Sequence, residues 1–234
     1  MHILRKITFF DKIRKNLNPV FEREEFVKRK LAELSKGSIL LDAGCGSQIY
    51  KKYCTHLNYK TQDFGKYTGD EKEAFNTTSQ YEYGSLDYQG NIWDIKVKEN
   101  AFDNILCTEV FEHIPYPIET VKEFSRVLKS GGKLILTAPS NSLRHMDPYY
   151  FYSGFSDRWY EKILVENGFK IVSIDQVGDH YRWVSTELLR TMLSHSFLSK
   201  ILLLPAFIFY YSRNENASSL NSLCYGYHII AEKI

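Results

Sequence analysis

The sequence predicts an α/β domain in which a mostly parallel sheet is sandwiched between helices. Short apolar segments typical of buried strands alternate with segments of helical periodicity, which is the pattern of βαβ units. The first apolar segment ends at Asp42 and enters a glycine turn at residues 44–46, as a buried parallel strand does at its carboxyl end. The strand pattern returns at residues 226–232, so the sheet is expected to include the end of the chain.

The remaining elements follow in order along the chain. Residues 19–35 have helical spacing, with Pro19 in the first turn and Gly37 at the stop, and residues 1–36 are expected to form an N-terminal helical cap. Residues 37–234 are then expected to form the main domain. Further strands are expected at residues 57–63, 88–92, 102–107, 133–138, 169–174 and 226–232, and helices at 117–129 and 157–167. Residues 65–85 show no clear period and are expected to form a loop.

Composition excludes several classes of protein. With 44% hydrophobic residues, 234 residues are enough to bury the core of one ordinary domain. The formal net charge of +2 argues against a dedicated nucleic-acid-binding protein. The four cysteines form no CxxC pair, which favours free thiols in a reducing compartment. No apolar run of signal-peptide length opens the sequence, so a cytoplasmic location is expected.

A helical insertion is expected at residues 180–223, where a hairpin between the last two strands would suffice. Its segment 196–211 is strongly apolar but too short to cross a bilayer, which takes about 20 apolar residues. Three interpretations stay open. The segment packs on the sheet or the N-terminal helix, forms a homodimer interface, or makes peripheral contact with a membrane beside the basic N-terminal arm.

Acidic residues follow the first three strands of the predicted sheet. Asp42 stands before Gly44 and Gly46, and Ile49 replaces the third glycine of a dinucleotide fingerprint. A carboxylate at this turn repels a pyrophosphate and attracts a cation or hydroxyl donors. Asp63 suits the two hydroxyls of a ribose, with Asp70 and Glu71 as nearby rivals, and Asp94 suits the amino group of an adenine.

Three ordered motifs carry a family resemblance. They are Leu41-Asp42-Ala43-Gly44-Cys45-Gly46-Ser47, Asp103-Asn104-Ile105-Leu106-Cys107-Thr108-Glu109-Val110-Phe111-Glu112-His113-Ile114, and the segment 124–139 with Gly131-Gly132 at its centre. Over residues 37–178 and the last strand, the chain resembles class I S-adenosylmethionine-dependent methyltransferases of the small-molecule, type 11-like kind. The resemblance implies a Rossmann-like, seven-stranded sheet with an antiparallel last strand. It also implies S-adenosylmethionine as cofactor and S-adenosylhomocysteine as product.

The resemblance also implies cofactor-binding residues. The turn would hold the methionine moiety, and Asp63 with Phe64 would bind the ribose. Asp94 and the Ile95 backbone would bind the adenine. The end of the fourth strand would line the cofactor near the transferred methyl group. The set is Asp42, Ala43, Gly44, Cys45, Gly46, Asp63, Phe64, Asp94, Ile95, Cys107, Thr108 and Glu109. The chain departs from the family at Gln48, where many members have a further glycine.

Two histidines and an aromatic stretch mark the acceptor side. His145 and His113 follow the fifth and fourth strands and are candidate general bases, His145 being preferred. Tyr149, Tyr150 and Tyr152 suit a sugar or an aromatic ring as substrate. A similar stretch occurs in methyltransferases associated with cell-surface polysaccharides. No metal site is expected, because the catechol-type members have an Asp just after the fourth strand where this chain has Cys107-Thr108-Glu109.

The sequence therefore predicts methyl transfer from S-adenosylmethionine to a small molecule, with a hydroxyl of a sugar, glycolipid or related metabolite as the leading acceptor. One alternative is methylation of a quinone-like or lipid-like ring. Another is a cofactor-binding protein without catalysis. Nucleic acid is not expected as a partner, since the net charge is small and the fourth strand lacks an Asn/Asp-Pro-Pro-Tyr tetrad.

Overall fold

The computed structural model describes residues 17–69 and 82–234. The contacts divide the chain into two compact units, one of Met1–Glu25 with Gln176–Tyr225 and one of Phe26–Asp175 with Gly226–Ile234. The second unit contains almost the whole sheet and the helices that cover it. Asp70, Glu71 and the basic arm before residue 17 lie outside the described residues.

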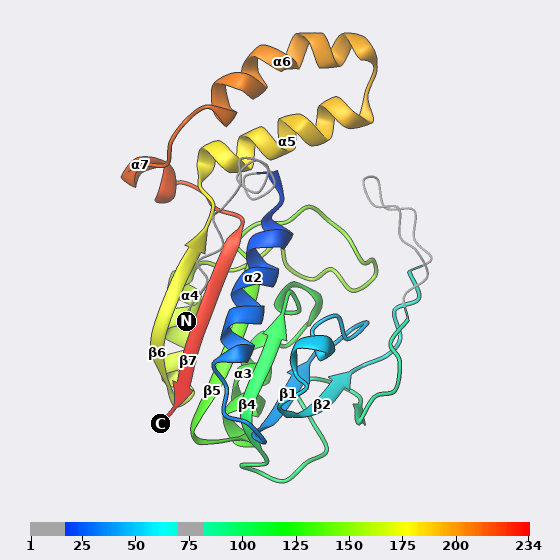
Figure 1. Ribbon diagram of the computed structural model, residues 1–234, viewed down its shortest axis with the longest axis vertical. Coiled ribbons are helices and arrows are strands. Elements are labelled where there is room, and N and C mark those ends of the chain that lie inside the picture. The colour runs from blue at the N-terminus through cyan, green and yellow to red at the C-terminus, as the bar shows by residue number, and fades with distance from the viewer. Residues whose placement is uncertain (1–16, 70–81) are drawn as a thin grey trace. The chain divides into compact units, whose positions relative to one another are not determined.

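A seven-stranded sheet in the order β3-β2-β1-β4-β5-β7-β6 forms the centre of the fold (Figure 1). The strands are β1 Ile39–Ala43, β2 Asn58–Asp63, β3 Tyr88–Gln89, β4 Phe102–Thr108, β5 Leu128–Pro139, β6 Phe169–Val177 and β7 Gly226–Lys233. The pairs from β3 to β5 are parallel, and β7 pairs antiparallel with β5. This confirms the expected fold class. The strand order reverses between β1 and β4, and ligands of such sheets bind beyond the carboxyl ends of the strands at that point.

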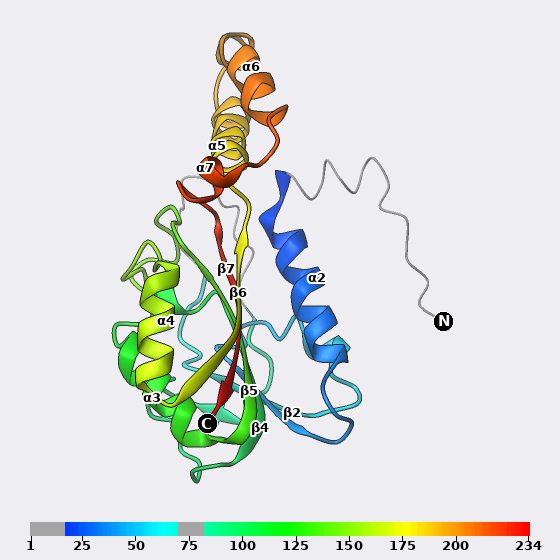
Figure 2. The ribbon, with the colours of Figure 1, turned by 90° about the vertical axis from the view of Figure 1, so that its left-hand side faces the viewer.

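Helices cover both faces of this sheet (Figure 2). They are the second half of α2 (Pro19–Ala32), from Phe26 on, on one face, and α3 Pro117–Val127 and α4 Asp157–Glu166 on the other. Because side chains alternate along a strand, neighbouring residues enter different cores. Leu41, Ile105, Leu134, Leu136 and Ile229 pack in the core with α3 and α4. Leu40, Leu106, Ile135 and Ile230 pack in the core with the second half of α2.

The expected boundaries hold except around β3 and β5 and at the ends of α2 and β6: α2 ends at Ala32 rather than at residue 35, and β6 extends to Val177 rather than to residue 174. β3 is limited to Tyr88–Gln89, and β5 begins at Leu128 rather than at Lys133. Helix α3 ends at Val127 and the chain enters β5 directly, with Leu128 paired to Phe102. Gly132 lies within this strand, where a Cβ atom would lie 2.7 Å from the Lys129 carbonyl oxygen. The double glycine therefore permits a close backbone approach inside the strand and does not precede it.

The other unit contains the insertion, which forms α5 His180–Ser194, α6 Phe197–Tyr211 and the short α7 Ala217–Leu220. Asp179 and Ser196 cap the first two helices by accepting from the backbone N–H groups of Arg182 and Ser199. Tyr210 of α6 packs against the rings of His180 and Tyr181 of α5. The two long helices are therefore joined along one side of α6.

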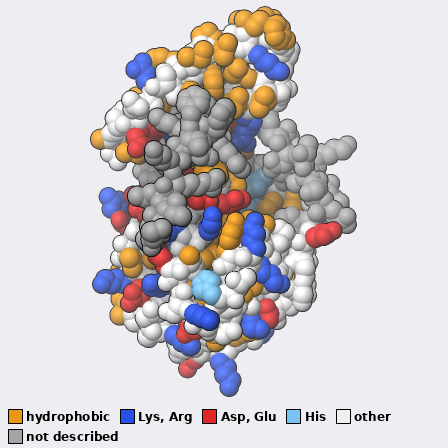
Figure 3. All heavy atoms as spheres, in the orientation of Figure 1, with side chains coloured by type: hydrophobic (Ala, Val, Ile, Leu, Met, Phe, Trp, Pro, Cys, Tyr) orange, Lys and Arg blue, Asp and Glu red, His pale blue; other side chains and the backbone are white. Residues whose placement is uncertain are grey.

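The opposite side of α6 is apolar and exposed, and Figure 3 shows hydrophobic side chains gathered over these helices. The exposed apolar residues of α6 are Phe197, Leu198, Ile201, Leu202, Leu204, Ile208 and Phe209. No helix of the described residues has both the length and the apolar character that a membrane span requires. The three expectations for segment 196–211 stay predictions.

A matched pair of leucines tests this description of core and surface. Leu134 in β5 is completely buried, whereas Leu202 in α6 is 69% exposed. We expect Leu134→Ala to lower the free energy of unfolding by about 2–5 kcal/mol, because it leaves a cavity. Leu202→Ala is expected to change it by less than about 0.5 kcal/mol. Urea denaturation of both variants and the wild type measures this. A large loss for Leu202→Ala would mean that another surface covers α6.

Candidate functional site

The glycine turn after β1 has no room for a larger residue at its first position. Gly44 has a φ of +72°, and a Cβ atom there would lie 2.4 Å from a methyl carbon of Val110. The backbone N–H groups of Gly44 and Cys45 both donate to the Gln62 carbonyl oxygen, at 2.8 and 3.0 Å. The turn is therefore fixed against the end of β2.

Asp63 joins this turn to the next loop. One carboxylate oxygen accepts from the Gly46 N–H at 2.9 Å and the other from the Gly65 N–H at 3.0 Å. The side chain is 6% exposed, and burial raises its pKa while these N–H groups oppose the rise. Each carboxylate oxygen retains acceptor capacity, since a carboxylate offers about four lone-pair sites. Asp63 is thus held in place and still able to accept a ligand hydroxyl.

Asp42 lies beneath the turn at the end of β1 and is 1% exposed. The Tyr59 hydroxyl donates to its carboxylate at 2.5 Å. Burial, with a smaller contribution from the charge of Asp63, raises the pKa of Asp42 to about 7, and the Tyr59 hydrogen bond opposes this rise. The Asp42 carboxyl therefore gains its negative charge near neutral pH, and that charge would attract a cation bound at the turn.

Gln48 occupies the position where many members of the resembling family have glycine. Its φ is +57°, so it adopts the left-handed conformation that glycine favours. Its side-chain amide donates to the carbonyl oxygens of Tyr83 and Ser85, at 2.7 and 2.9 Å. Gln48 thus keeps the backbone conformation of the turn and adds two hydrogen bonds to the segment that leads into β3.

The residues expected at an adenine are differently engaged. Asp94 is exposed and forms an ion pair with Lys96. The Ile95 N–H donates to Glu123 at 2.7 Å, and the Ile95 carbonyl oxygen accepts from Arg126 at 3.0 Å. In this arrangement the buried Glu123 carboxylate takes the N–H that the resemblance assigned to adenine, because a buried carboxylate requires hydrogen-bond donors.

The end of β4 is tied to β5. Cys107 is completely buried, and burial raises the pKa of its thiol well above the ordinary value, so it stays neutral. After Thr108, Glu109 has a φ of +53°, and its carboxylate accepts from the Thr137 hydroxyl at 2.9 Å. The Glu109 N–H also donates to the Thr137 carbonyl oxygen at 2.9 Å. Glu109 therefore fixes the backbone at this edge of the sheet.

The structure brings both candidate bases together with the loop after β2. Phe64 packs edge-on against Tyr149, with ring centroids 4.8 Å apart. The Tyr149 carbonyl oxygen accepts from Nδ1 of His113 at 2.9 Å. The rings of His113 and His145 lie 4.7 Å apart, close to perpendicular. The predicted cofactor loop, an expected substrate residue and the two histidines are therefore neighbours.

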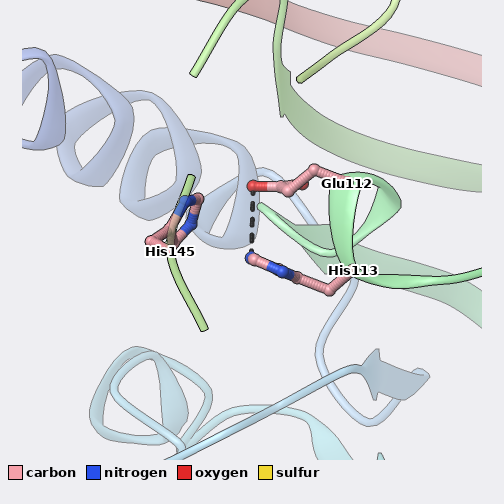
Figure 4. Close-up of side chains that lie close together, drawn as sticks. All are labelled: Glu112, His113 and His145. Carbon is pink, nitrogen blue, oxygen red and sulfur yellow. Dashed lines mark ion pairs between the residues drawn. The ribbon is translucent and has the colours of Figure 1, made fainter. Parts of the chain in front are cut away.

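Glu112 joins the histidines, and sequence reasoning did not single it out (Figure 4). It lies on the short helix η2 Phe111–His113, is 2% exposed, and places Oε1 3.6 Å from Nε2 of His113. Ligating atoms of Glu112, His113 and His145 all lie within 4.8 Å of one another. Glu112 and His113 are adjacent in the sequence, so their pairing could be seen there. The position of His145 beside them depends on the conformation of the loop after β5.

The other expected substrate residues hold that loop. The Tyr150 hydroxyl donates to the Ser142 carbonyl oxygen at 2.6 Å, and the Tyr152 hydroxyl donates to the Pro115 carbonyl oxygen at 3.3 Å. The N–H groups of Phe151 and Tyr152 both donate to the Glu112 carbonyl oxygen. The aromatic segment is thus fastened to η2, which sets the distance between His145 and His113.

Residues 41–136 match the model of the methyltransferase domain family. This segment begins in β1 and ends within β5, so it contains the glycine turn, Asp63 and the Glu112–His113 pair. Residues 41–136 belong to this family. The seven-stranded sheet around the methyltransferase domain is of the class I type that the sequence motifs predicted.

Curated relatives match overlapping parts of this chain. An uncharacterised protein of Methanocaldococcus jannaschii is 28% identical over 68% of this chain and 66% of its own length. A ubiquinone biosynthesis O-methyltransferase of Xanthomonas euvesicatoria is 31% identical over 52% of this chain and 49% of its own length. The chain thus spans about half to two thirds of the length of these curated relatives.

Two solved structures share the fold at low sequence identity. A geranyl diphosphate methyltransferase in complex with S-adenosylmethionine is 14% identical, with a TM-score of 0.57 over 91% of this chain and 85% of that one. A cyclase is 16% identical, with a TM-score of 0.56 over 88% of this chain and 79% of that one. Because one of these names is not that of a methyltransferase, the fold by itself does not fix the reaction.

The raised pKa of Asp42 predicts how its replacement changes stability with pH. Between its ordinary pKa of 3.8 and about 7, the unfolded chain ionises this carboxyl while the folded chain keeps the proton. The free energy of unfolding therefore falls as pH rises through this window, by about 1.4 kcal/mol per unit of pKa difference. Asp42→Asn cannot ionise and is expected to lack this decline.

Urea denaturation of wild type and Asp42→Asn between about pH 4 and pH 8 measures the effect. The variant should gain stability relative to wild type as pH rises through the window, and the difference should be constant above it. Because groups distant from Asp42 titrate alike in both proteins, they cancel in the comparison. A difference that stays constant over the whole range would show that burial does not raise the pKa of Asp42.

Proposed function

We propose that this chain transfers a methyl group from S-adenosylmethionine to a hydroxyl oxygen of a small molecule. The observation that carries the proposal is the edge of the sheet at β1, β2 and β4. There the glycine turn, which has no room for a side chain at Gly44, lies in one unit with the buried carboxylates of Asp42 and Asp63. The same unit holds His113, His145 and Glu112. The first part suits a cofactor with a cationic centre and a ribose, and the second suits a hydroxyl that must lose a proton.

The residues present fit the cofactor. Gly44 and Gly46 have positive φ values, and glycine permits close approach of a ligand to the backbone, while Asp42 lies buried at the end of β1 beneath the turn. Asp42 would face the cationic methionine end, and Asp63 would accept the ribose hydroxyls while retaining its bonds to Gly46 and Gly65. When bound, S-adenosylmethionine supplies a methyl group activated by the sulfonium.

The acceptor side supports oxygen as the methylated atom. Nδ1 of His113 and Nδ1 of His145 lie 2.9 and 2.8 Å from the carbonyl oxygens of Tyr149 and Leu143. A carbonyl oxygen only accepts, so each Nδ1 carries a hydrogen, and in the neutral form of either ring Nε2 has a lone pair. An imidazole with this tautomer takes the proton that a hydroxyl loses as its oxygen is methylated.

For the acceptor class we favour a hydroxyl on a quinol-like ring. The relatives named as ubiquinone biosynthesis O-methyltransferases support this choice. The Tyr150 ring lies 5.6 Å from the His145 ring, the Phe64 ring packs on Tyr149, and such aromatic side chains suit a flat apolar acceptor. A sugar or glycolipid hydroxyl, the leading expectation from the sequence, is the second candidate, because aromatic rings also stack on sugars.

Calorimetric titration with S-adenosylhomocysteine tests the cofactor assignment. We expect wild type to bind it with micromolar affinity and Asp63→Ala to bind it more weakly by about 1.5–3 kcal/mol, the usual size for hydrogen bonds to a charged group. Asp175→Ala, which removes an exposed carboxylate of β6, is the matched control and should bind as wild type does. Circular dichroism verifies that each variant is folded. Absence of binding to wild type at millimolar ligand would overturn the proposal.

Replacement of the histidines tests the acceptor side. We expect His145→Ala and His113→Ala to lower kcat by about 10²–10⁴-fold while leaving the affinity for S-adenosylhomocysteine unchanged, because they act on the acceptor proton. The assay offers S-adenosylmethionine with catechol-type phenols and with sugars, and mass spectrometry locates the added methyl group. Transfer to nitrogen or carbon, or full activity in both variants, would contradict the assignment. Cofactor binding without transfer to any acceptor would favour the non-catalytic alternative.

A further inference from the structure

Helix α6 leaves seven large apolar side chains exposed, whereas α2, α3, α4 and α5 leave one each. Figure 3 shows hydrophobic side chains gathered in this part of the molecule. The helix belongs to the unit that contains the insertion and shares no residue with the proposed methyl-transfer site. Contiguous exposed apolar patches usually mark contact sites, because water at such a surface carries a free-energy cost.

The exposed side chains form one continuous stripe along α6. At 3.6 residues per turn they fall in two adjacent rows, Phe197-Ile201-Leu204-Ile208 and Leu198-Leu202-Pro205-Phe209. No polar residue lies within the stripe. The opposite side of α6 packs on α5, where Tyr210 contacts the rings of His180 and Tyr181 (Figure 1). The stripe is therefore a complete apolar face, with the other face of the helix occupied.

The charges near this face are of one sign. Between Glu187 and Glu215 the chain has three basic residues, Arg190, Lys200 and Arg213, and no acidic one. Arg190 forms an ion pair with Glu187 at 3.3 Å, which leaves Lys200 and Arg213 as exposed cations. An apolar face accompanied by cations is complementary to a surface that is apolar within and anionic at its border.

The two exposed cations flank the stripe. Lys200 precedes Leu204 by one turn and lies at the edge of the first row. Arg213 follows the helix and lies over the ring of Phe209, with its guanidinium carbon 4.1 Å from the ring centroid. Such side chains lay their stems on apolar surface and hold their charge at its polar border. This is the arrangement of a helix that lies in a membrane interface, where cations meet phosphate headgroups.

A second copy of the chain fits this face less well. In a contact with two-fold symmetry, the same residues of both copies meet. Lys200 and Arg213 of one copy would then approach the cations of the other, and α6 has no acidic residue to pair with them. Like charges brought together around an apolar contact oppose association. The charges therefore favour an anionic occupant over a copy of this chain.

We propose that the exposed face of α6 binds the surface of a bilayer that contains anionic phospholipids. The helix would lie in the plane of the interface, with its two apolar rows among the upper acyl chains. Lys200 and Arg213 would meet the phosphate groups. The proposal goes beyond methyl transfer, because it assigns a surface by which the chain is held at a membrane.

Co-sedimentation of the full chain with lipid vesicles tests the apolar face. We expect wild type to bind vesicles of phosphatidylcholine with phosphatidylglycerol, and to bind phosphatidylcholine alone more weakly. Ile201→Glu and Leu202→Glu should each weaken binding at least about tenfold, because each removes a large apolar side chain from the acyl region and places a charge there. Val165→Glu is the matched control and should bind as wild type does, since Val165 of α4 is 57% exposed and Ile201 is 53% exposed.

Replacement of the cations tests the anionic border. Lys200→Ala and Arg213→Ala should each weaken binding to the anionic vesicles by about fivefold. Their effect on binding to phosphatidylcholine alone is expected to be small. Added salt should weaken the binding of wild type to the anionic vesicles, because it screens exposed charges. Circular dichroism verifies the folding of each variant.

Two results would overturn the proposal. One is absence of wild-type binding to either vesicle, and the other is binding that persists undiminished in Ile201→Glu and Leu202→Glu. If wild type binds no vesicle but forms a dimer that Ile201→Glu dissociates in sedimentation equilibrium, the face belongs to a second copy. Neither cofactor nor methyl transfer enters these measurements, so their failure leaves the proposed function untouched.

Discussion

The buried carboxylate of Asp63 is the interaction on which the proposed cofactor site depends. It accepts from the N–H of Gly46 in one loop and from the N–H of Gly65 in the next, so two loops at the switch point of the sheet share one support. Neither loop has a strand or helix to satisfy these N–H groups. Without the carboxylate they would be buried donors with a considerable desolvation cost.

This arrangement concentrates negative charge at low exposure. Asp42, Asp63 and Glu112 are all buried, and Asp63 raises the pKa of Asp42. The fold opposes this repulsion locally, through the Tyr59 hydroxyl on Asp42 and the backbone N–H groups on Asp63. Such an edge is less stable by itself than an apolar one would be, and a cationic ligand relieves part of the repulsion.

The sequence was sufficient for the fold and for the turn, because both rest on local patterns. Strand ends, glycines and acids lie within a few residues of one another, so Asp42, Gly44 and Gly46 could be placed from spacing alone. Contacts between distant loops were not accessible in this way. The meeting of His145 with Glu112 depends on hydrogen bonds between the loop after β5 and η2, and the engagement of the Ile95 N–H depends on Glu123 in α3. No periodicity encodes either pairing.

The proposed cofactor side and the proposed acceptor side of the site are held by different contacts. This difference matters for how a domain of this fold comes to accept a particular substrate. The turn and Asp63 are fixed by neighbouring strands β1 and β2, whereas His113 and His145 are fixed by a loop whose tyrosine hydroxyls and N–H groups bond to backbone carbonyl oxygens. Those carbonyl oxygens accept from any donor of suitable reach. Because the two sides have separate supports, side chains of the loop can change without altering the turn after β1, and one fold can serve different acceptors.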